Sequence, residues 1–466
     1  MNKALVCALS LIGLALAGCS MAPTYEKPDT PVPSAWPAGP AYPTPDASAP
    51  RADELKWQEF FTDARLHKLI ETALANNRDL RLAALNVERA QALYGIQRAE
   101  LFPSVGARGG GSREQRSADL LQQGQPRTDS RYSVDLGIVA WEIDFFGRIR
   151  SLSAQALEEY LATDEARRGA QIALVAEVAR AFLTLAADRE NLQLSRATLE
   201  SQRAAHALVK RRFEVGLANE LDLKRAQVPL DTARRDVAVY TQFVAQDKNA
   251  LDLLVGTPVA EDWLAPDLAS VSPPKPISGG LTSDVLLRRP DVMAAEHRLK
   301  GAYANIGAAR AALFPRISLT TTLGTASDQL SRLFESGTGT WLFTPQFVMP
   351  IFDARLWAAL RVSKTDQEII QTEYERAIQT AFREVSDALA VRGTIDEQVA
   401  AQQSLAAALA DSYRLATLRF DKGTDSYLSV LDAQRAHFAA QQVLILLRLA
   451  GMVSQARLYA VLGGGG

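Results

Sequence analysis

The sequence predicts an α+β fold with a two-fold internal repeat, in which long helices alternate with pairs of β-strands. Three observations lead to this prediction. Two segments occur twice in the same order, long stretches place apolar residues at steps of three and four, and shorter stretches alternate apolar with polar residues. Steps of three and four are the spacing of an amphipathic helix, and alternation is the spacing of a strand with one apolar face.

The shorter duplicated segment has the pattern of a helical turn. Residues Arg212–Gln227 resemble Arg419–Gln434, and every position is displaced by the same number of residues, without a gap. In each copy a helical pattern stops at a glycine, Gly216 or Gly423. Glycine readily adopts the left-handed conformation found at helix C-termini. Because a second helical pattern follows each glycine, the chain is expected to form two antiparallel helical hairpins.

The longer duplicated segment divides the chain into two halves. Residues 79–103 match 291–315, and both copies end in Leu-Phe-Pro, where the proline stops a helix. We expect the first repeat to cover 53–256 and the second 290–462. The stretch between them, 257–289, is rich in Pro, Gly and Ser, which is typical of a linker.

After each Leu-Phe-Pro the hydrophobic period changes from helical to two. This alternation predicts two β-hairpins, at about 104–144 and 317–350. Their four strands are expected at about 104–116, 130–144, 317–327 and 339–350. The first hairpin is the longer one, and because length changes concentrate in exposed loops, the extra residues are expected within Ser117–Thr128.

Long helical patterns follow both hairpins. Residues 147–213 and 354–420 are 67 residues each, which corresponds to about 100 Å for a continuous helix. The returning helices are expected at 219–256 and 426–462. Helices of this length do not form a compact core, so they predict a rod or the wall of a tube.

The N-terminus has the features of an exported protein. Residues 1–18 have the pattern of a signal peptide, with Lys3 before a short apolar run, and small residues precede Cys19. This arrangement resembles a bacterial lipobox and predicts a covalent lipid on Cys19; the alternative is an ordinary signal peptide with an incidental cysteine. Residues 19–52 hold nine of the 21 prolines and predict an extended tether. The glycines at 463–466 predict a disordered tail.

Composition and motifs exclude several classes of function. The formal net charge of −2 gives no electrostatic case for nucleic-acid binding. Cys19 is the only cysteine outside the signal peptide and the four histidines are scattered, so neither a disulfide nor a metal site is expected. The sequence contains no nucleophile elbow and no phosphate-binding loop. We therefore expect a protein that is not an enzyme and has no cofactor apart from the lipid on Cys19.

Four strands cannot close a barrel, and lipid does not tolerate unpaired strand edges. Outer-membrane barrels need at least eight strands, so membrane insertion requires several chains to share one barrel, and three chains supply twelve strands. Trp341, Phe343 and Phe347 fall on one face of the last strand, as in a lipid-facing surface or an aromatic girdle. The alternative is a soluble sheet with one half-buried face.

Several motifs together resemble the TolC-like outer-membrane efflux factors, and most closely their lipoprotein branch (OprM-like, NodT type). The resemblance covers essentially the whole chain. In chain order, the motifs are Leu16-Ala-Gly-Cys19, Pro23-x-Tyr25-x-x-Pro28, Trp57-x-x-Phe60-x-x-Asp63, the paired Leu-Phe-Pro, Trp141-Glu-Ile-Asp-Phe-Phe-Gly147, Pro350-Ile-Phe-Asp353 and Tyr427-Leu-x-Val-Leu-Asp-Ala-Gln434.

The resemblance implies a homotrimer with a 12-stranded outer-membrane β-barrel, four strands per chain, continuous with a long periplasmic α-helical barrel. It implies the exit duct of a tripartite efflux system, which passes drugs or other small molecules to the exterior. The implied partners are a periplasmic adaptor protein and an inner-membrane pump of the resistance–nodulation–division class. The implied location is the outer membrane, with a lipid anchor and a large periplasmic portion. The alternative is a lipid-anchored periplasmic coiled-coil scaffold without a pore, which would have no two-faced strands.

Four charged residues near the turns are candidates for a periplasmic gate. The resemblance places Asp222 and Asp432 where the family carries aspartates that constrict the closed channel, and it adds Asp425 and Arg435 as polar links of the lipoprotein branch. Three copies of a carboxylate near a narrow axis would repel anions and bind cations. The alternative for Asp222 is structural, because Asn219-x-x-Asp222 also fits a variant capping box at the start of a helix.

The exposed turns are candidates for contact with the adaptor. They centre on Gly216 and Leu217 in the first tip and on Gly423 and Thr424 in the second. The alternative is that these turns serve only as helix caps, with Ser426 available as the N-cap of the last helix.

Overall fold

The computed structural model describes residues 20–42, 50–52, 54–122, 124–277 and 282–464. The predicted signal peptide, Cys19 and the end of the glycine tail lie outside the described residues. The chain folds as two compact units, and each unit takes segments from both sequence halves. The first unit contains Asn86–Thr163 and Ala294–Tyr374 with the N-terminal residues up to Asp29, and the second unit contains the remainder.

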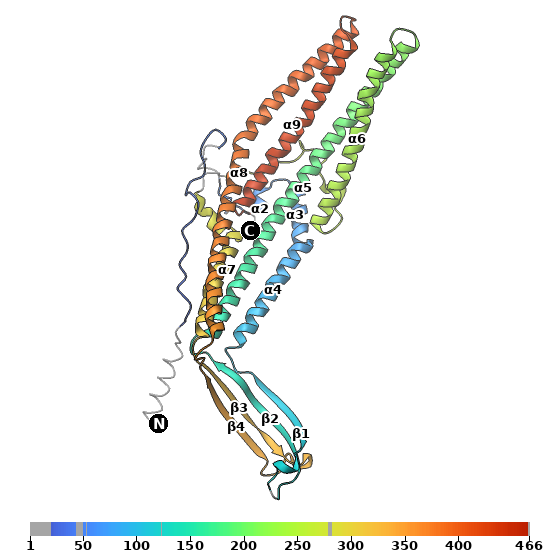
Figure 1. Cartoon of the computed structure of the whole chain (residues 1–466). Helices are drawn as coiled ribbons and strands as arrows, with labels where there is room; N and C mark the ends of the chain where they lie inside the picture. Colours follow the sequence, from blue (N-terminus) through green and yellow to red (C-terminus); the bar gives the residue numbers. More distant parts are fainter. Residues whose placement is uncertain (1–19, 43–49, 53, 123, 278–281, 465–466) are drawn as a thin grey trace. The chain divides into compact units, whose positions relative to one another are not determined.

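The first unit contains a four-stranded antiparallel sheet (Figure 1). Its strands lie side by side in chain order: β1 (Val105–Gln115), β2 (Thr128–Ile143), β3 (Arg316–Ser327) and β4 (Gly339–Val348). The prediction of two consecutive hairpins is confirmed. Because β1 and β4 are the edges of the sheet, the outer backbone N–H and C=O groups of both strands point away from it.

The sheet has one mainly apolar face, as the alternation predicts. Leu136 of β2, Leu323 of β3 and Trp341 of β4 lie opposite one another in a row across the strands. Trp341 shares its face with Phe343 and Phe347, and the three aromatic side chains are 78%, 59% and 63% exposed. A cluster of aromatic side chains this exposed needs an apolar environment outside the chain.

The first hairpin owes its extra length to a strand rather than to its loop. The loops 116–127 and 328–338 differ by one residue, whereas β2 has 16 residues and β4 has 10. The prediction that the extra residues lie within Ser117–Thr128 is therefore wrong.

A bulge in β2 accommodates part of this extra length. Val139 and Ala140 lie between Ile138 and Trp141, where the register of β2 against β3 shifts. Ala140 has a φ of 54° and its N–H donates to Thr320 Oγ1 at 3.0 Å. A bulge inserts residues into one strand without changing its partner, so the strand lengthens while the turn does not.

Helices make up the rest of the chain. Two long helices, α5 and α8, follow the hairpins and run through both compact units, and α6 and α9 return antiparallel to them (Figure 1). The four predicted helices agree with these elements to within one residue at each end. The helices are α2 (Trp57–Phe60), α3 (Ala64–Asn76), α4 (Arg78–Ala99), α5 (Arg148–Glu214), α6 (Glu220–Val255), α7 (Pro290–Ala311), α8 (Ala354–Asp421) and α9 (Tyr427–Val461), with short 3-10 helices η1 (Ala118–Leu120), η2 (Glu261–Trp263), η3 (Ser283–Arg288) and η4 (Leu330–Arg332).

The N-terminal residues of the first unit pack against α7. Gly307 of α7 lacks a side chain at the point where this segment crosses, and a β-carbon there would clash with it. Tyr25 contacts Tyr303 edge to face, with 5.5 Å between ring centroids, and Lys27 Nζ lies 3.0 Å from Glu296 Oε2. These contacts hold the segment along the helix.

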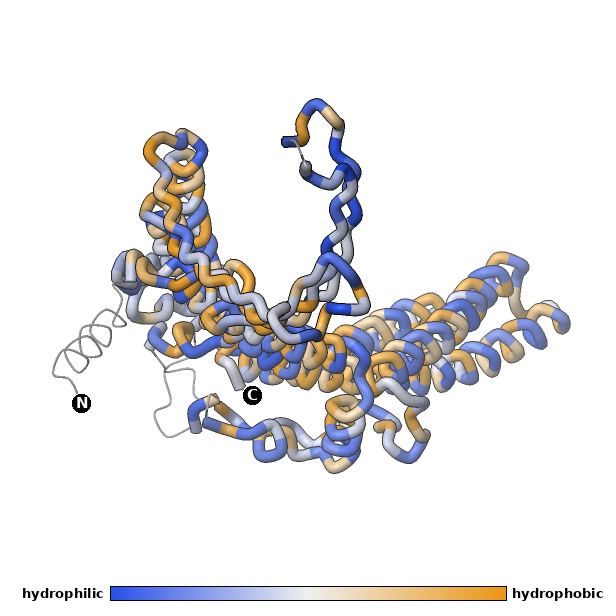
Figure 2. Tube along the Cα trace, turned by 90° about the horizontal axis from the view of Figure 1, so that it is seen from below, coloured by the Kyte–Doolittle hydropathy of each residue, from blue (hydrophilic) through white to orange (hydrophobic). Residues whose placement is uncertain are grey.

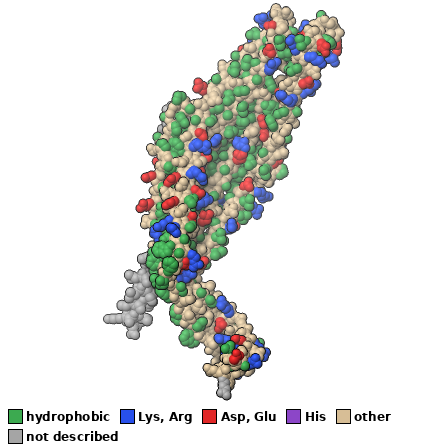
Figure 3. Space-filling model, viewed as in Figure 1, with side chains coloured by type: hydrophobic (Ala, Val, Ile, Leu, Met, Phe, Trp, Pro, Cys, Tyr) green, Lys and Arg blue, Asp and Glu red, His purple; other side chains and the backbone are tan. Residues whose placement is uncertain are grey.

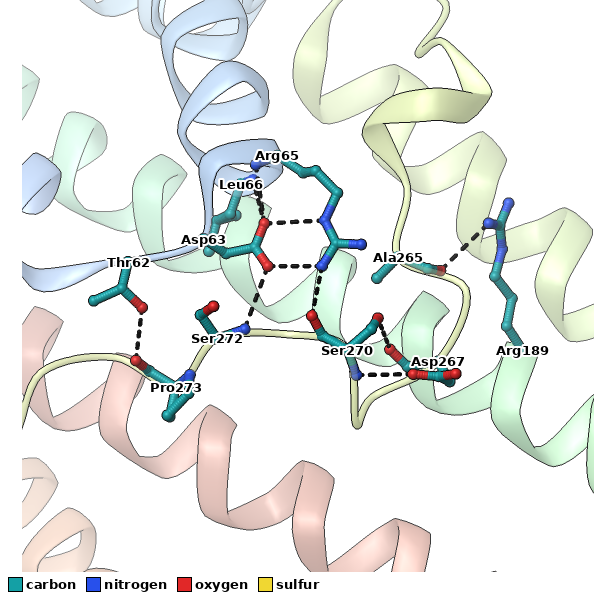
Figure 4. A network of polar contacts seen from close by, with 10 residues as sticks. All are labelled: Thr62, Asp63, Arg65, Leu66, Arg189, Ala265, Asp267, Ser270, Ser272 and Pro273. Carbon is teal, nitrogen blue, oxygen red and sulfur yellow. Dashed lines mark hydrogen bonds and ion pairs between the residues drawn. The ribbon is translucent and has the colours of Figure 1, made fainter.

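In the second unit, hydrogen bonds join α3 to the segment between the repeats (Figure 4). Asp63 is the N-cap of α3 and accepts from the N–H of Arg65 at 2.9 Å. The Arg65 guanidinium donates to both carboxylate oxygens of Asp63, at 3.1 and 2.8 Å, and to the carbonyl of Ser270 at 2.8 Å. The N–H of Ser272 also donates to Asp63, at 3.3 Å. One carboxylate therefore caps a helix and fixes the linker.

The motif around Asp63 forms this junction. Burial by itself would raise the pKa of the Asp63 carboxyl, but hydrogen bonds from the Arg65 side chain and from backbone N–H groups outweigh burial and hold that pKa below its usual value. Trp57 and Phe60, three residues apart, are 5% and 0% exposed. Phe60 stacks on Tyr459 of α9 with 4.0 Å between ring centroids. The motif thus connects the start of the first repeat to the end of the second.

Helices α5, α6 and α9 pack against one another in the second unit. Leu199 of α5 forms a buried cluster with Leu230 and Ala233 of α6, and Gln434 of α9 donates to Ser201 Oγ of α5 at 3.2 Å. Hydrophobic and hydrophilic residues are interleaved along the helical hairpins (Figure 2). Each helix therefore buries only part of its circumference.

A pair of acids lies between α5 and α6. Asp188 and Asp247 are within hydrogen-bond reach of each other, and Asp247 Oδ2 is buried without a donor among the described residues. Burial, and then the contact with Asp247, raises the pKa of Asp188 to about 7. Two ionised carboxylates in contact repel each other, so a shared proton holds this pair together.

This pair should make the protein less stable as the pH rises. An Asp in an unfolded chain titrates near pH 4, so from about pH 4 to pH 7 the folded state binds more protons than the unfolded state, and the free energy of unfolding falls. Asp188→Asn removes the group that binds the extra proton, so the free energy of unfolding should no longer fall over this pH range. We expect the variant to melt at a higher temperature than the wild type at pH 8 but not at pH 5, by circular dichroism. Asp411→Asn, at an exposed position on α8, is the control. A difference between Asp188→Asn and the wild type that does not change with pH would contradict the shared proton.

Candidate functional site at the helical tips

The two tips share one backbone conformation. Gly216 and Gly423 have φ values of 74° and 73°, in the left-handed region. In each tip the N–H of the residue after the glycine donates to the carbonyl five residues earlier, at 2.7 Å in the first tip and 3.0 Å in the second. This is the hydrogen bond of a Schellman motif. The prediction that each long helix ends at its glycine is confirmed.

The tips differ where the next helix begins. At α6, Asn219 Oδ1 accepts from the N–H of Asp222 at 2.9 Å and Asp222 Oδ2 accepts from the N–H of Asn219 at 3.4 Å, which completes a capping box. At α9, Ser426 occupies the N-cap position but its side chain makes no capping bond. Asp425 Oδ1 instead accepts from the N–H of Ser426 at 2.8 Å and from the hydroxyl of Ser429 at 2.9 Å. Ser426 is therefore an N-cap in position only, and the preceding carboxylate makes the side-chain contacts at this helix start.

Asp425 connects the end of α8 to the start of α9. Its Oδ2 lies 3.2 Å from Arg419 Nε. The hydrogen bond from Ser429, followed by those from the Ser426 N–H and Arg419, lowers the pKa of the Asp425 carboxyl below its usual value. Asp425 therefore stays ionised at neutral pH and closes the second tip within one chain.

The other gate candidates lie on separate hairpins. Arg435 Nη2 is 3.5 Å from Asp432 Oδ1, one turn apart on α9, and both side chains are more than half exposed. Exposed pairs of this kind contribute little to stability, so these charges are available to another chain. Asp222 is engaged in the capping box of α6. The structure brings Asp432 together with Arg435 and Asp425 together with Arg419, and within the described chain Asp222 does not join them.

An aromatic contact links the two tips, which sequence reasoning missed. The guanidinium carbon of Arg212, at the end of α5, lies 5.6 Å from the ring centroid of Phe420, at the end of α8, within the range of a cation–π interaction. The Phe420 ring lies 5.2 Å from that of Tyr427 on α9. Burial raises the pKa of Tyr427 to about 12, so its hydroxyl is neutral. The duplicated Arg-Phe pair was the available clue, but the sequence does not show which copy contacts which.

The tips themselves are exposed. Val215 and Leu217 are 70% and 71% exposed in the first tip, and Gly423 and Thr424 are exposed in the second. Charged side chains of both signs gather around the tip ends (Figure 3). Among the described residues, no three side chains of His, Cys, Asp or Glu come together as a metal site requires. The tips thus offer a surface suited to contact with another protein.

Comparison with known proteins relates the whole chain to channels. The family model for outer membrane efflux proteins matches residues 69–257 and 281–464. The antibiotic efflux pump outer membrane protein ArpC and the toluene efflux pump outer membrane protein TtgC, both of Pseudomonas putida, are each 48% identical over 466 residues, which cover 100% of this chain and 96% of the relative. Two curated relatives thus match over nearly their full length.

The fold is also that of a solved channel. The open state of the Neisseria gonorrhoeae MtrE outer membrane channel superposes with a TM-score of 0.86 at 36% identity, covering 96% of this chain and 98% of the channel. Since both compact units take part in a superposition of this extent, the likeness includes the sheet and the helical hairpins alike.

Proposed function

The chain belongs to the outer membrane efflux protein family, and we propose that its two helical tips form the periplasmic gate of an efflux channel. The protein is an outer-membrane transport channel, not an enzyme, and acts as the exit duct of a tripartite efflux system. The fold is that of trimeric channels in which each chain contributes four strands to a shared barrel of twelve. The two-faced strands leave no place for the alternative of a scaffold without a pore.

The proposal of a gate rests on one observation: the turns at the tips are fixed within each hairpin, whereas the other contacts at the tips are weak. Both tips are fixed by left-handed glycines and by carboxylate caps, so their local shape is set within each hairpin. Between the two tips, Arg212 stacks on Phe420, and the Asp432–Arg435 pair within α9 is exposed. In a trimer, three copies of Asp222 and Asp432 would surround the axis, and opening would break only such weak contacts.

The proposal includes two partners. A periplasmic adaptor protein would contact Gly216 and Leu217 of the first tip and Gly423 and Thr424 of the second. An inner-membrane pump, of the resistance–nodulation–division class that the sequence motifs imply, would deliver cargo through that adaptor. Relatives named for antibiotic and toluene efflux support organic small molecules as cargo.

Neutralising the gate acids should open the channel. The double variant Asp222→Ala/Asp432→Ala loses one of the two hydrogen bonds of the α6 capping box, from the Asn219 N–H to Asp222, worth up to about 1 kcal/mol per chain. It also loses an i,i+3 ion pair worth up to about 0.5 kcal/mol. Three chains multiply this loss. We expect the purified trimer in a planar bilayer to show a small conductance as wild type and a several-fold larger one as the double variant.

The control is Asp411→Ala, which removes an exposed acid that pairs with Arg414 on α8, away from the gate. The mass of the oligomer is measured on the same samples, so that a monomer is not mistaken for a closed channel. A trimer whose conductance is the same in the wild type and the double variant would place the gate elsewhere.

Charged substitutions at the tips should uncouple the channel from its adaptor. Thr424→Arg and Leu217→Arg change exposed side chains while leaving the neighbouring glycines in place. We expect cells carrying either variant to lose resistance to exported antibiotics, with normal amounts of trimer in the outer membrane. Leu208→Arg, at a position 48% exposed on α5 and away from the turn, is the matched control. Full resistance in both tip variants would rule out the adaptor contact.

We also propose that Cys19 carries the only covalent group of the mature protein, a lipid. The support is the run Leu16-Ala17-Gly18 directly before Cys19, which fits cleavage by the lipoprotein pathway. The intact mass of the purified chain should begin at Cys19 and exceed the peptide mass by that of a lipid modification, and the excess should disappear in Cys19→Ser. An unmodified Cys19 thiol in the wild type would overturn the anchor.

A further inference from the structure

A pocket lies between the two helical hairpins of the second unit, a few turns from the tips. Its volume is about 380 Å³, within the range of small-molecule sites. Helices α5, α6 and α9, which run alongside one another in Figure 1, form its walls. Its lining is mainly apolar, with Val228, Pro229 and Ala233 from α6 and Leu428, Leu431 and Phe438 from α9.

The buried amide of Gln202 is a polar group in the lining of this mainly apolar pocket. Gln202 of α5 lines the pocket and is 4% exposed, and its Oε1 receives no hydrogen bond from the described residues. Pro229 also lines the pocket, inside α6. Because proline has no N–H, the carbonyl of Arg225, one turn earlier, lacks its helical donor. Gln202 Oε1 is thus an unsatisfied acceptor on a residue of the lining, and a ligand that donates a hydrogen bond would satisfy it.

The charges at the pocket decide between classes of ligand. Arg225 and Arg435 belong to its lining, and both residues are exposed. Arg435 is paired with Asp432 at 3.5 Å and adds little net charge, but a guanidinium group also interacts favourably with the face of an aromatic ring. Asp236 lies nearby, but its carboxylate is engaged by Arg235 at 2.6 Å. The site is thus best matched by a neutral aromatic molecule.

We propose that this pocket binds small neutral phenols. The hydroxyl donates to Gln202 Oε1 on α5, the ring packs between Leu431 and Phe438 of α9, and the guanidinium of Arg435 covers the ring face. Such a ligand touches both hairpins at once and holds α9 against α5 and α6. The site shares Arg435 with the proposed gate, where Arg435 pairs with Asp432.

The test uses 1-naphthol as the probe and the full trimer in lipid nanodiscs, with empty nanodiscs as the blank. Isothermal titration calorimetry is expected to show saturable binding of one molecule per chain. The matched compound 1-methoxynaphthalene, whose oxygen cannot donate, is expected to bind roughly five- to tenfold more weakly, the effect of one hydrogen bond. Heat no greater than that of the empty nanodiscs would overturn the proposal.

Two variants locate the binding. Gln202→Leu keeps the size of the side chain but removes the acceptor, and it should bring 1-naphthol down to the affinity of 1-methoxynaphthalene. Val228→Trp, at a lining position 66% exposed, should block the pocket and abolish binding. Val443→Trp, at an exposed position on α9 that is not part of the lining, is the control and should bind normally. Unchanged binding in Val228→Trp would show that the probe binds elsewhere, and unchanged binding in Gln202→Leu would overturn the role of Gln202.

Hydrogen exchange gives a second readout, separate from transport and from gating. Saturating 1-naphthol should slow amide exchange near Leu431 in α9 and near Val228 in α6 together, because the ligand bridges the two helices. The Val228→Trp variant should show no such change. Slower exchange in only one of the two helices would contradict a bridging ligand.

Discussion

The unpaired edges of the sheet constrain how the whole molecule can assemble in a membrane. β1 and β4 end the sheet on either side, and the hydrocarbon of a membrane supplies no partner for their outer N–H and C=O groups. Pairing β4 with β1 of a neighbouring chain satisfies both edges in a closed barrel, and the solved channels with this fold are trimers. In a trimer of this kind, the proposed gate at the tips would be built from three equal copies of one chain.

This symmetry explains why weak contacts suffice at the tips. A closed channel must open in use, so the links that close it cannot be as strong as those that shape it. The shaping contacts are local: the left-handed Gly216 and Gly423, and the caps made by Asp222 and Asp425. The contacts that reach beyond a hairpin are single exposed interactions, each of at most about 1 kcal/mol. In the proposed gate, three copies of these links would close the channel together while each single link stays easy to break.

The local sequence pattern predicted much of this structure. Contacts between segments that are distant in the sequence could not be predicted in this way. The turns, strands and long helices follow from glycine, proline and hydrophobic period, which act within a few residues. The bulge at Ala140 was not predicted because it depends on the register of β2 against β3. The side-chain contacts at the start of α9 come from Asp425 rather than from the predicted Ser426, because Asp425 accepts from the Ser426 N–H and the Ser429 hydroxyl. The contact of Arg212 with Phe420, and the approach of Asp188 to Asp247, join helices whose pairing no local pattern specifies.

The interface along α5 differs in kind from the junction near Asp63. At that junction Asp63 has hydrogen-bond donors on several sides, and Phe60 stacks on an aromatic ring. Along α5, Asn191 Oδ1, Ser195 Oγ and Gln202 Oε1 are buried without a donor among the described residues. Their spacing of four and seven residues puts them on one face of the helix. Each such group costs about 1–3 kcal/mol, so packing on this face is weaker than its burial implies. Asn191 and Ser195 lie close to the linker, because Arg189 and Gln193 of α5 donate to the carbonyls of Ala265 and Pro266. Of the three residues, only Gln202 lies toward the tips. The cost of unsatisfied groups is therefore spread along α5 from the junction toward the proposed gate, rather than concentrated at either end.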